Sequence, residues 1–132
     1  MIGLDTDVLI RYLAQDDARQ SAIATRLIEK TLSPANRGFV SLVALLETIW
    51  VMESAYGADA TLIADIVSDL LDTAALEVQD GSSVRDAIAR FRKGDVDIDD
   101  CLIGSLALQR GAEKTVTFDA KASRRLGMEL LK

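Results

Sequence analysis

The chain has 132 residues, a net charge of −6 at pH 7 and 49% hydrophobic residues. That length fits one domain with a real core, and the hydrophobic content excludes a disordered polymer. No apolar run approaches the roughly 20 residues that a membrane span needs. One cysteine and no histidine exclude an internal disulfide, imidazole zinc sites and histidine general bases, and they favour a reducing, cytoplasmic location.

In the first part of the chain, short apolar runs alternate with amphipathic segments. The opening residues lead directly into a strand, without the basic and apolar regions of a signal peptide. We expect a strand at 1–4, a helix opening at 5–7, a helix from 16 to about 32, a strand at 38–40, a helix from 42 to about 56, a helix at 59–72 and a strand at 74–78.

The second part continues the pattern around an uncharged stretch, Cys101–Leu108, which is expected to be helical and buried on nearly every face. We expect a helix capped by Ser82 or Ser83 and running to about 92, the uncharged helix, a buried strand at 115–118, a basic helical turn through 125 and a strand at 128–131. This alternation predicts a single α/β domain over residues 1–132, an α/β/α sandwich with a mainly parallel central sheet.

Four acidic residues are expected to meet at one edge of this sheet. Asp5 ends the first strand, Asp100 begins the uncharged helix, and Asp119 ends the strand after it. Parallel topology brings these points to the edge where open α/β sheets place ligands. Glu47 lies near the second turn of the helix leaving the second strand, among apolar neighbours where an unpaired carboxylate is unfavourable to bury.

Carboxylates gathered in this way repel one another unless a cation neutralises them or some bind protons. Because the donors are all oxygen, the pattern predicts a Mg²⁺ or Mn²⁺ site open enough to receive a phosphate. Ordinary helix capping is the competing interpretation for Asp5, for Asp97 with Asp100, and for Asp119. Glu47 lies several residues beyond any cap, so capping does not account for it.

Basic residues occur in two short stretches despite the negative total charge. An acidic centre between basic patches suits a metal-dependent enzyme that acts on a polyanion, whereas each patch taken singly is more simply a solvated surface. The two stretches consist of Arg85, Arg90, Arg92 and Lys93, and of Lys114, Lys121, Arg124 and Arg125.

Four motifs, in order along the whole chain, resemble those of PIN-domain proteins, and in size and arrangement the chain is most similar to the VapC toxin of VapBC toxin–antitoxin systems. The motifs are Asp5-Thr6-Asp7-Val8-Leu9-Ile10, where the family typically has DTN; Glu47 in the helix after a Val-Ser strand exit; Asp97–Ile103, which resembles DFADALI; and Thr117-Phe118-Asp119, which matches TFD. Asp7 departs from the usual asparagine and Asp99 from a small residue.

The resemblance implies a Mg²⁺- or Mn²⁺-dependent endoribonuclease, usually homodimeric, that is neutralised by a small antitoxin whose C-terminal segment occupies the groove. Carried over by position, Asp5, Asp100 and Asp119 would hold the metal, and Glu47 would orient or deprotonate the attacking water. Thr6 and Thr117 would be supporting hydroxyls. The implied reaction is hydrolysis of an RNA phosphodiester by metal-activated water.

Two other functions fit parts of the same sequence. Asp5-x-Asp7 with the segment 94–99 imitates motifs of haloacid-dehalogenase-type phosphatases, in which Asp5 would be the nucleophile. Against this, the segment before Gly94 is helical and basic rather than a strand. A non-catalytic PIN-like module that binds partners would need only the fold.

Overall fold

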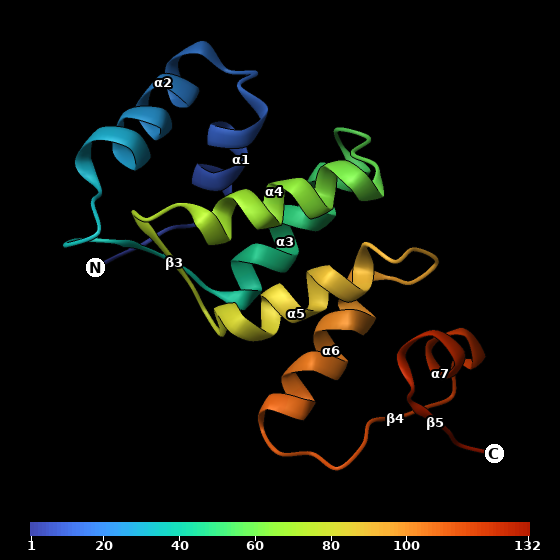
Figure 1. Ribbon diagram of the computed structural model, residues 1–132. Coiled ribbons are helices and arrows are strands. Elements are labelled where there is room, and N and C mark those ends of the chain that lie inside the picture. The colour runs from blue at the N-terminus through green and yellow to red at the C-terminus, as the bar shows by residue number, and fades with distance from the viewer. The chain divides into compact units, whose positions relative to one another are not determined.

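The computed structural model describes residues 1–132, which form helices joined by short parallel strands (Figure 1). The chain divides into two compact units, Met1–Gln79 and Asp80–Lys132. Each unit has its own parallel sheet. None of the helices combines the length and the apolar character that crossing a bilayer requires.

The first unit is built on a three-stranded parallel sheet in the order β1-β2-β3. The strands are β1 (Ile2–Gly3), β2 (Gly38–Val40) and β3 (Leu76–Val78). Gly38 pairs with Ile2 on one side and Leu76 on the other. A Cβ atom at this position would lie 2.7 Å from Cδ1 of Leu32, so a glycine lets the chain between α2 and β2 pack against the centre of the sheet.

Four α-helices of the first unit begin at side-chain caps. Asp5, Asp17, Ser41 and Asp59 each accept a hydrogen bond from a backbone N–H of the following first turn. The helices are α1 (Thr6–Ala14), α2 (Ala18–Arg26), α3 (Leu42–Ser54) and α4 (Ala60–Asp72), and a π-helical turn, η1 (Leu27–Thr31), follows α2.

The core of the first unit lies where α1 packs against α2 and α3, and where α4 packs against β3. Its fully buried side chains include Leu9, Leu45 and Ile63, each 0% exposed. Burial of one such side chain stabilises the fold by about 1.5–3 kcal/mol. This core fixes the positions at which α1 and α3 leave the sheet.

The second unit pairs α5 with α6 and adds a small parallel sheet, β4-β5, together with α7. Ser105 on α6 donates a hydrogen bond from its hydroxyl to Asp86 Oδ2 on α5 at 2.7 Å. The elements are α5 (Gly81–Phe91), α6 (Ile98–Gln109), β4 (Val116–Thr117), α7 (Ala120–Leu126) and β5 (Glu129–Leu130).

The elements confirm the expected alternation of helices and parallel strands, with three local corrections. Asp80, rather than a serine, precedes the first residue of α5. Helix α6 is not buried on nearly every face, because Ile103 is 54% and Leu108 is 50% exposed. Strand β4 is not buried either, and Phe118 beside it is 82% exposed.

The correction to α6 has a simple physical reason. Its buried residues, Ile98, Cys101, Leu102 and Ser105, follow a single helical stripe that faces its neighbours. Apolar residues elsewhere on α6 are present in the sequence, but no element covers them.

The prediction of one domain over 1–132 stays a prediction.

Candidate functional site

Three carboxylates gather at the N-terminus of α6, in the second unit. Asp97 is the N-cap residue in extended conformation, and its side chain makes no capping hydrogen bond. Asp99 and Asp100 occupy the first turn. Carboxylate oxygens of the three residues all lie within 4.8 Å of one another. These donors suit a hard divalent cation such as Mg²⁺.

Asp119 extends this group from the loop after β4. It caps α7, with Oδ1 accepting from the backbone N–H groups of Lys121 at 2.8 Å and Ala122 at 3.2 Å. Thr117 Oγ1 accepts from the Asp119 N–H at 3.0 Å and helps to fix the loop. The capping interpretation is therefore correct for Asp119, but one carboxylate oxygen remains without a hydrogen bond. We call Asp97, Asp99, Asp100 and Asp119 the acidic cluster.

Asp100 is the member of the acidic cluster whose ionisation is perturbed. Partial burial raises the pKa of Asp100 above its ordinary value, and the negative charges of Asp99, Asp97 and Asp119 raise it further. The positive charge of Lys121 opposes the rise. A bound cation would relieve the repulsion that raises this pKa, so the residues present fit a divalent metal.

The raised pKa predicts how the metal-free protein responds to Asp100→Asn. The folded protein binds the Asp100 proton more tightly than the unfolded chain, so ionisation of Asp100 reduces stability as pH rises through the folded pKa. The asparagine variant, which cannot ionise, should be at least as stable as the parent at neutral pH in EDTA. Its advantage should shrink as the pH falls towards the ordinary value of 3.8. Urea denaturation across this pH range measures the difference.

Asp69→Asn is the matched control for this pH effect. Asp69 is exposed on α4 and its side chain makes no hydrogen bond or ion pair. Its replacement removes the same charge outside the acidic cluster, so it shows what the loss of one carboxylate does to stability without the neighbours of Asp100. An Asp100→Asn variant that is less stable than the parent at neutral pH would contradict the prediction.

Asp5 and the start of α3 lie at one edge of the sheet in the first unit. Strands β1 and β2 are parallel, and Asp5 and Ser41 follow their carboxyl ends as the caps of α1 and α3. Asp5 Oδ1 accepts from the Thr6 N–H at 2.7 Å. Thr6 itself is buried, at 9% exposed. The capping interpretation is thus correct for Asp5 as well.

Glu47 projects from the second turn of α3 and is exposed. It makes no hydrogen bond or ion pair. Its apolar neighbours Val43 and Trp50 are 78% and 66% exposed, so the expectation that it lies on a buried stripe is wrong. The buried face of α3 is formed instead by Ala44, Leu45, Thr48, Ile49 and Met52. Glu47 is a free carboxylate without a capping role.

The structure brings together part of the predicted set. Asp100 and Asp119 interact electrostatically in the second unit, as the helix–strand topology predicts. Asp5 and Glu47 belong to the first unit, so the meeting of all four stays a prediction. The structure also gives the acidic cluster two members that the sequence analysis does not place among the metal ligands, Asp97 and Asp99. In the sequence these two residues are indicated by the spacing Asp-x-Asp-Asp at the start of a helix. The cap residue, Asp97, is not helical there and lies next to the first turn, which holds Asp99 and Asp100.

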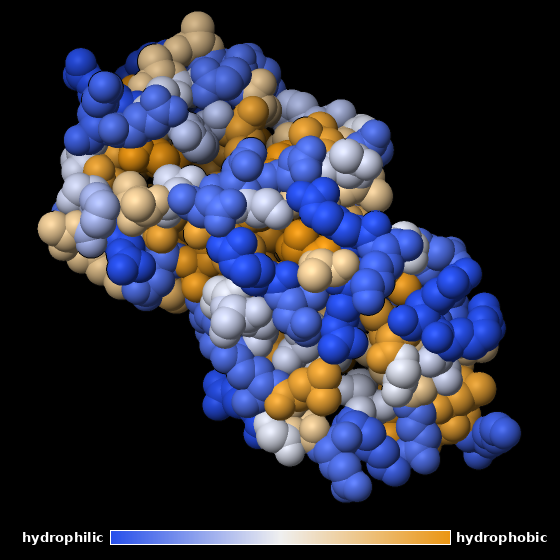
Figure 2. All heavy atoms as spheres, in the orientation of Figure 1, coloured by the Kyte–Doolittle hydropathy of each residue, from blue (hydrophilic) through white to orange (hydrophobic).

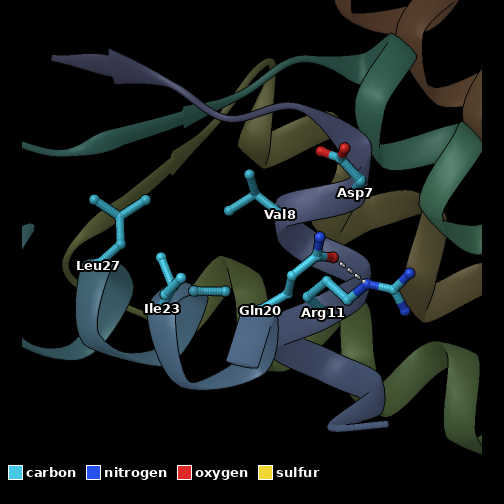
Figure 3. A pocket seen from close by; sticks show the side chains of 7 residues that line it. Asp7, Val8, Arg11, Gln20, Ile23 and Leu27 are labelled. Carbon is cyan, nitrogen blue, oxygen red and sulfur yellow. Dashed lines mark hydrogen bonds between the residues drawn. The ribbon is translucent and has the colours of Figure 1, made fainter. Parts of the chain in front are cut away.

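A concavity of about 190 Å³ lies between α1 and α2 in the first unit (Figure 3). Val8, Ile23 and Leu27 give it an apolar lining, and Asp7 lies at the α1 side. Arg11 Nε donates to Gln20 Oε1 at 2.8 Å and links the two helices. This α1–α2 groove offers contacts for an apolar segment rather than for a phosphate.

Carboxylates gathered as at the start of α6 can hold a divalent cation, and phosphatases and nucleases use such cations to hydrolyse phosphate esters. Comparison with protein families identifies a PIN domain over residues 2–126, and the chain therefore belongs to the PIN-domain family. PIN domains are generally metal-dependent nucleases, so the chain has a nuclease-type fold, and the PIN-like α/β prediction is confirmed. A search of curated proteins finds no matching relative.

Proposed function

We propose that this protein is a Mg²⁺- or Mn²⁺-dependent endoribonuclease and the toxin of a type II toxin–antitoxin system, of the VapC kind. The observation that carries the nuclease proposal is the acidic cluster, with three carboxylates within 4.8 Å and a pKa of Asp100 raised by its neighbours, in a chain of the PIN family. The toxin assignment rests on the resemblance of the sequence motifs.

In this proposal Asp5, Asp100 and Asp119 hold the metal and Glu47 orients or deprotonates the attacking water. The bound ion supplies activation of a water and neutralisation of charge on the phosphate. Thr117 supports Asp119 through its hydrogen bond, and Thr6 supports Asp5 by donating from its backbone N–H. Glu47 is suited to its role because its carboxylate has no competing partner.

The two alternative functions are less well supported. In the phosphatase interpretation Asp95 belongs to a catalytic motif, but Asp95 accepts from Arg125 Nε at 3.1 Å and lies 3.8 Å from Lys121 Nζ. The PIN match over most of the chain also favours the nuclease. A non-catalytic module would keep the fold without needing clustered carboxylates, whose mutual repulsion is unfavourable.

Two apolar surfaces support the proposed partners. The α1–α2 groove fits a short apolar segment of a small antitoxin, because Ile23 is 57% exposed beside it. On α3, Val43, Leu46 and Trp50 follow helical spacing and are exposed, which supports a homodimer through this face. We place the protein in the cytoplasm, where Cys101 stays reduced.

The proposal predicts cleavage of single-stranded or loop RNA that requires Mn²⁺ or Mg²⁺. Unpaired RNA is expected because side chains can reach its bases, whereas the deep, narrow major groove of an A-form duplex keeps base edges from them. Cleavage should stop in EDTA and weaken with salt, since phosphate contacts release counterions. Gel analysis of labelled oligonucleotides with each metal measures both effects.

A phosphomonoester assay run alongside separates the alternatives. Rapid release of phosphate from small phosphomonoesters, with RNA intact under every metal, would identify the phosphatase. Metal binding without any hydrolysis would identify the non-catalytic module. RNA cleavage in EDTA at the full rate would contradict the role of the metal.

A further inference from the structure

A basic cavity of about 500 Å³ lies in the second unit, beside the end of α5 and the end of α7. Hydrophilic side chains gather over these two elements on the face shown in Figure 2. Its lining brings together residues from the two basic stretches of the sequence, although these are about thirty positions apart. The charged residues that line it are Arg90, Lys93, Arg124, Arg125 and Asp86.

Two of the four cations in this cavity are held in place by carboxylates. Arg90 Nε lies 3.1 Å from Asp86 Oδ2, and Asp86 also accepts from Ser105. Arg125 donates to Asp95 Oδ2 through Nε at 3.1 Å and lies 3.0 Å from it through a terminal nitrogen. These contacts fix the guanidinium groups against the cavity.

The other two cations, Lys93 and Arg124, are exposed and make no ion pair. Lys93 acts electrostatically on Asp86, which is already paired with Arg90. The four cations of the lining therefore exceed the two carboxylates that contact them, Asp86 and Asp95, and the cavity keeps a positive charge although the whole chain carries −6. Gly94 lies in the lining, and no atom lies within 4 Å of where its Cβ would be, so a ligand can approach the backbone there. An anion with several separated charges fits this arrangement better than a single small ion.

The cavity is linked to the acidic cluster within the same unit. Lys121 Nζ lies 3.8 Å from Asp95, the partner of Arg125, and its charge also acts on Asp100. One side chain thus lies between the cations of the cavity and the carboxylates of the cluster. A polyanion bound in the cavity would pass close to the acidic cluster.

We propose that this cavity binds the phosphodiester backbone of single-stranded RNA through Lys93 and Arg124, next to the phosphate that is cleaved. The inference rests on the proposed function for its substrate and adds a binding site to it. The fixed guanidiniums of Arg90 and Arg125 orient phosphate oxygens, and the two free cations supply the net attraction. Contacts of this kind position RNA without reading its sequence.

The test compares Lys93→Gln/Arg124→Gln with Arg26→Gln/Lys30→Gln. The control pair removes the same charge from the end of α2 and from η1, where both side chains are exposed and make no ion pair. Binding of a labelled single-stranded RNA is measured in EDTA over a range of salt. The cavity variant should bind about tenfold more weakly near 100 mM salt, and its log–log salt slope should fall by about 1.4, the value for two single-strand phosphate contacts. The control variant should match the parent.

Each outcome separates this site from the proposed activity. Equal binding by the cavity and control variants, with a parent that still cleaves RNA, overturns the cavity site and leaves the nuclease standing. If the cavity variant binds RNA more weakly than the control variant, but the parent cleaves no RNA with any metal, the binding site is supported and the nuclease proposal is overturned. Polyglutamate should compete poorly with the RNA; displacement at equal charge concentration would assign the cavity to acidic polypeptides and overturn the proposal.

Discussion

Replacing Asp100 or Asp119 by asparagine should reduce RNA cleavage by at least about a hundredfold. Groups that merely orient a metal ligand contribute about 10–100-fold to affinity or activity, so loss of a ligand should have an effect at least as large. The same variants should lose the thermal stabilisation that Mg²⁺ or Mn²⁺ gives to the parent. That stabilisation is about 2.7 kcal/mol when the ion is present at 100 times its dissociation constant.

The prediction separates a metal ligand from a helix cap because asparagine caps a helix about as well as aspartate. Asp119 caps α7, and a purely structural Asp119 should tolerate asparagine without loss of activity. Asp59→Asn is the matched control. Asp59 caps α4 by accepting from the Leu62 N–H at 2.9 Å, and it lies in no candidate site.

Cleavage rate, metal-induced shift in melting temperature and metal-free melting temperature should be measured on all three variants. The nuclease proposal requires the first two to fall for Asp100→Asn and Asp119→Asn alone, with the metal-free protein no less stable than the parent. If Asp119→Asn melts lower without metal yet cleaves RNA at the parent rate, its carboxylate is only a cap.

Most helices and strands of the fold can be predicted from local sequence patterns. Side chains that favour N-caps begin α1, α2, α3 and α4, and Gly38 falls where the sheet leaves no room for a Cβ atom. These features depend on residues close in sequence, so pattern and propensity were sufficient. The prediction of a serine cap for α5 is wrong, because the residue before the helix is Asp80, which takes a left-handed conformation with φ of 50° and makes no side-chain capping bond.

Burial was harder to predict because it depends on which elements become neighbours. The absence of charged residues in the middle of α6 predicts that the helix is buried on nearly all faces. In the structure, only the stripe towards α5 and α7 is covered. Glu47 is a charge among apolar residues in the sequence, but two of these residues, Val43 and Trp50, are themselves exposed. Within the candidate site, the order of helix and strand in the sequence predicts that Asp100 and Asp119 lie close together, and this is confirmed. The basic cavity joins two stretches distant in sequence, and no local pattern predicts that they meet.

Glu47→Gln and Asp5→Asn should reduce cleavage as strongly as the changes in the acidic cluster. The prediction follows from the matching family motifs. Asp5 and Ser41, the cap of the helix that carries Glu47, both follow the carboxyl ends of parallel strands in the first unit. Glu47 is the cleaner of the two because it caps no helix and has no partner to lose. Its replacement should therefore leave the stability of the metal-free protein unchanged. Asp69→Asn, which removes one charge from α4, should cleave RNA at the parent rate.

The double variant Glu47→Gln/Asp100→Asn tests whether these acids act as one site. Residues that serve the same reaction step give strongly non-additive losses, whereas distant, independent residues give free-energy changes that add. We expect the double variant to cleave RNA about as slowly as the slower single variant. Additive losses, measured as the logarithm of kcat/KM on the same RNA, would mean that Glu47 acts apart from the acidic cluster. Full activity of Glu47→Gln would remove it from the site, and the catalytic role would then fall to Asp97 or Asp99, the carboxylates that already lie beside Asp100.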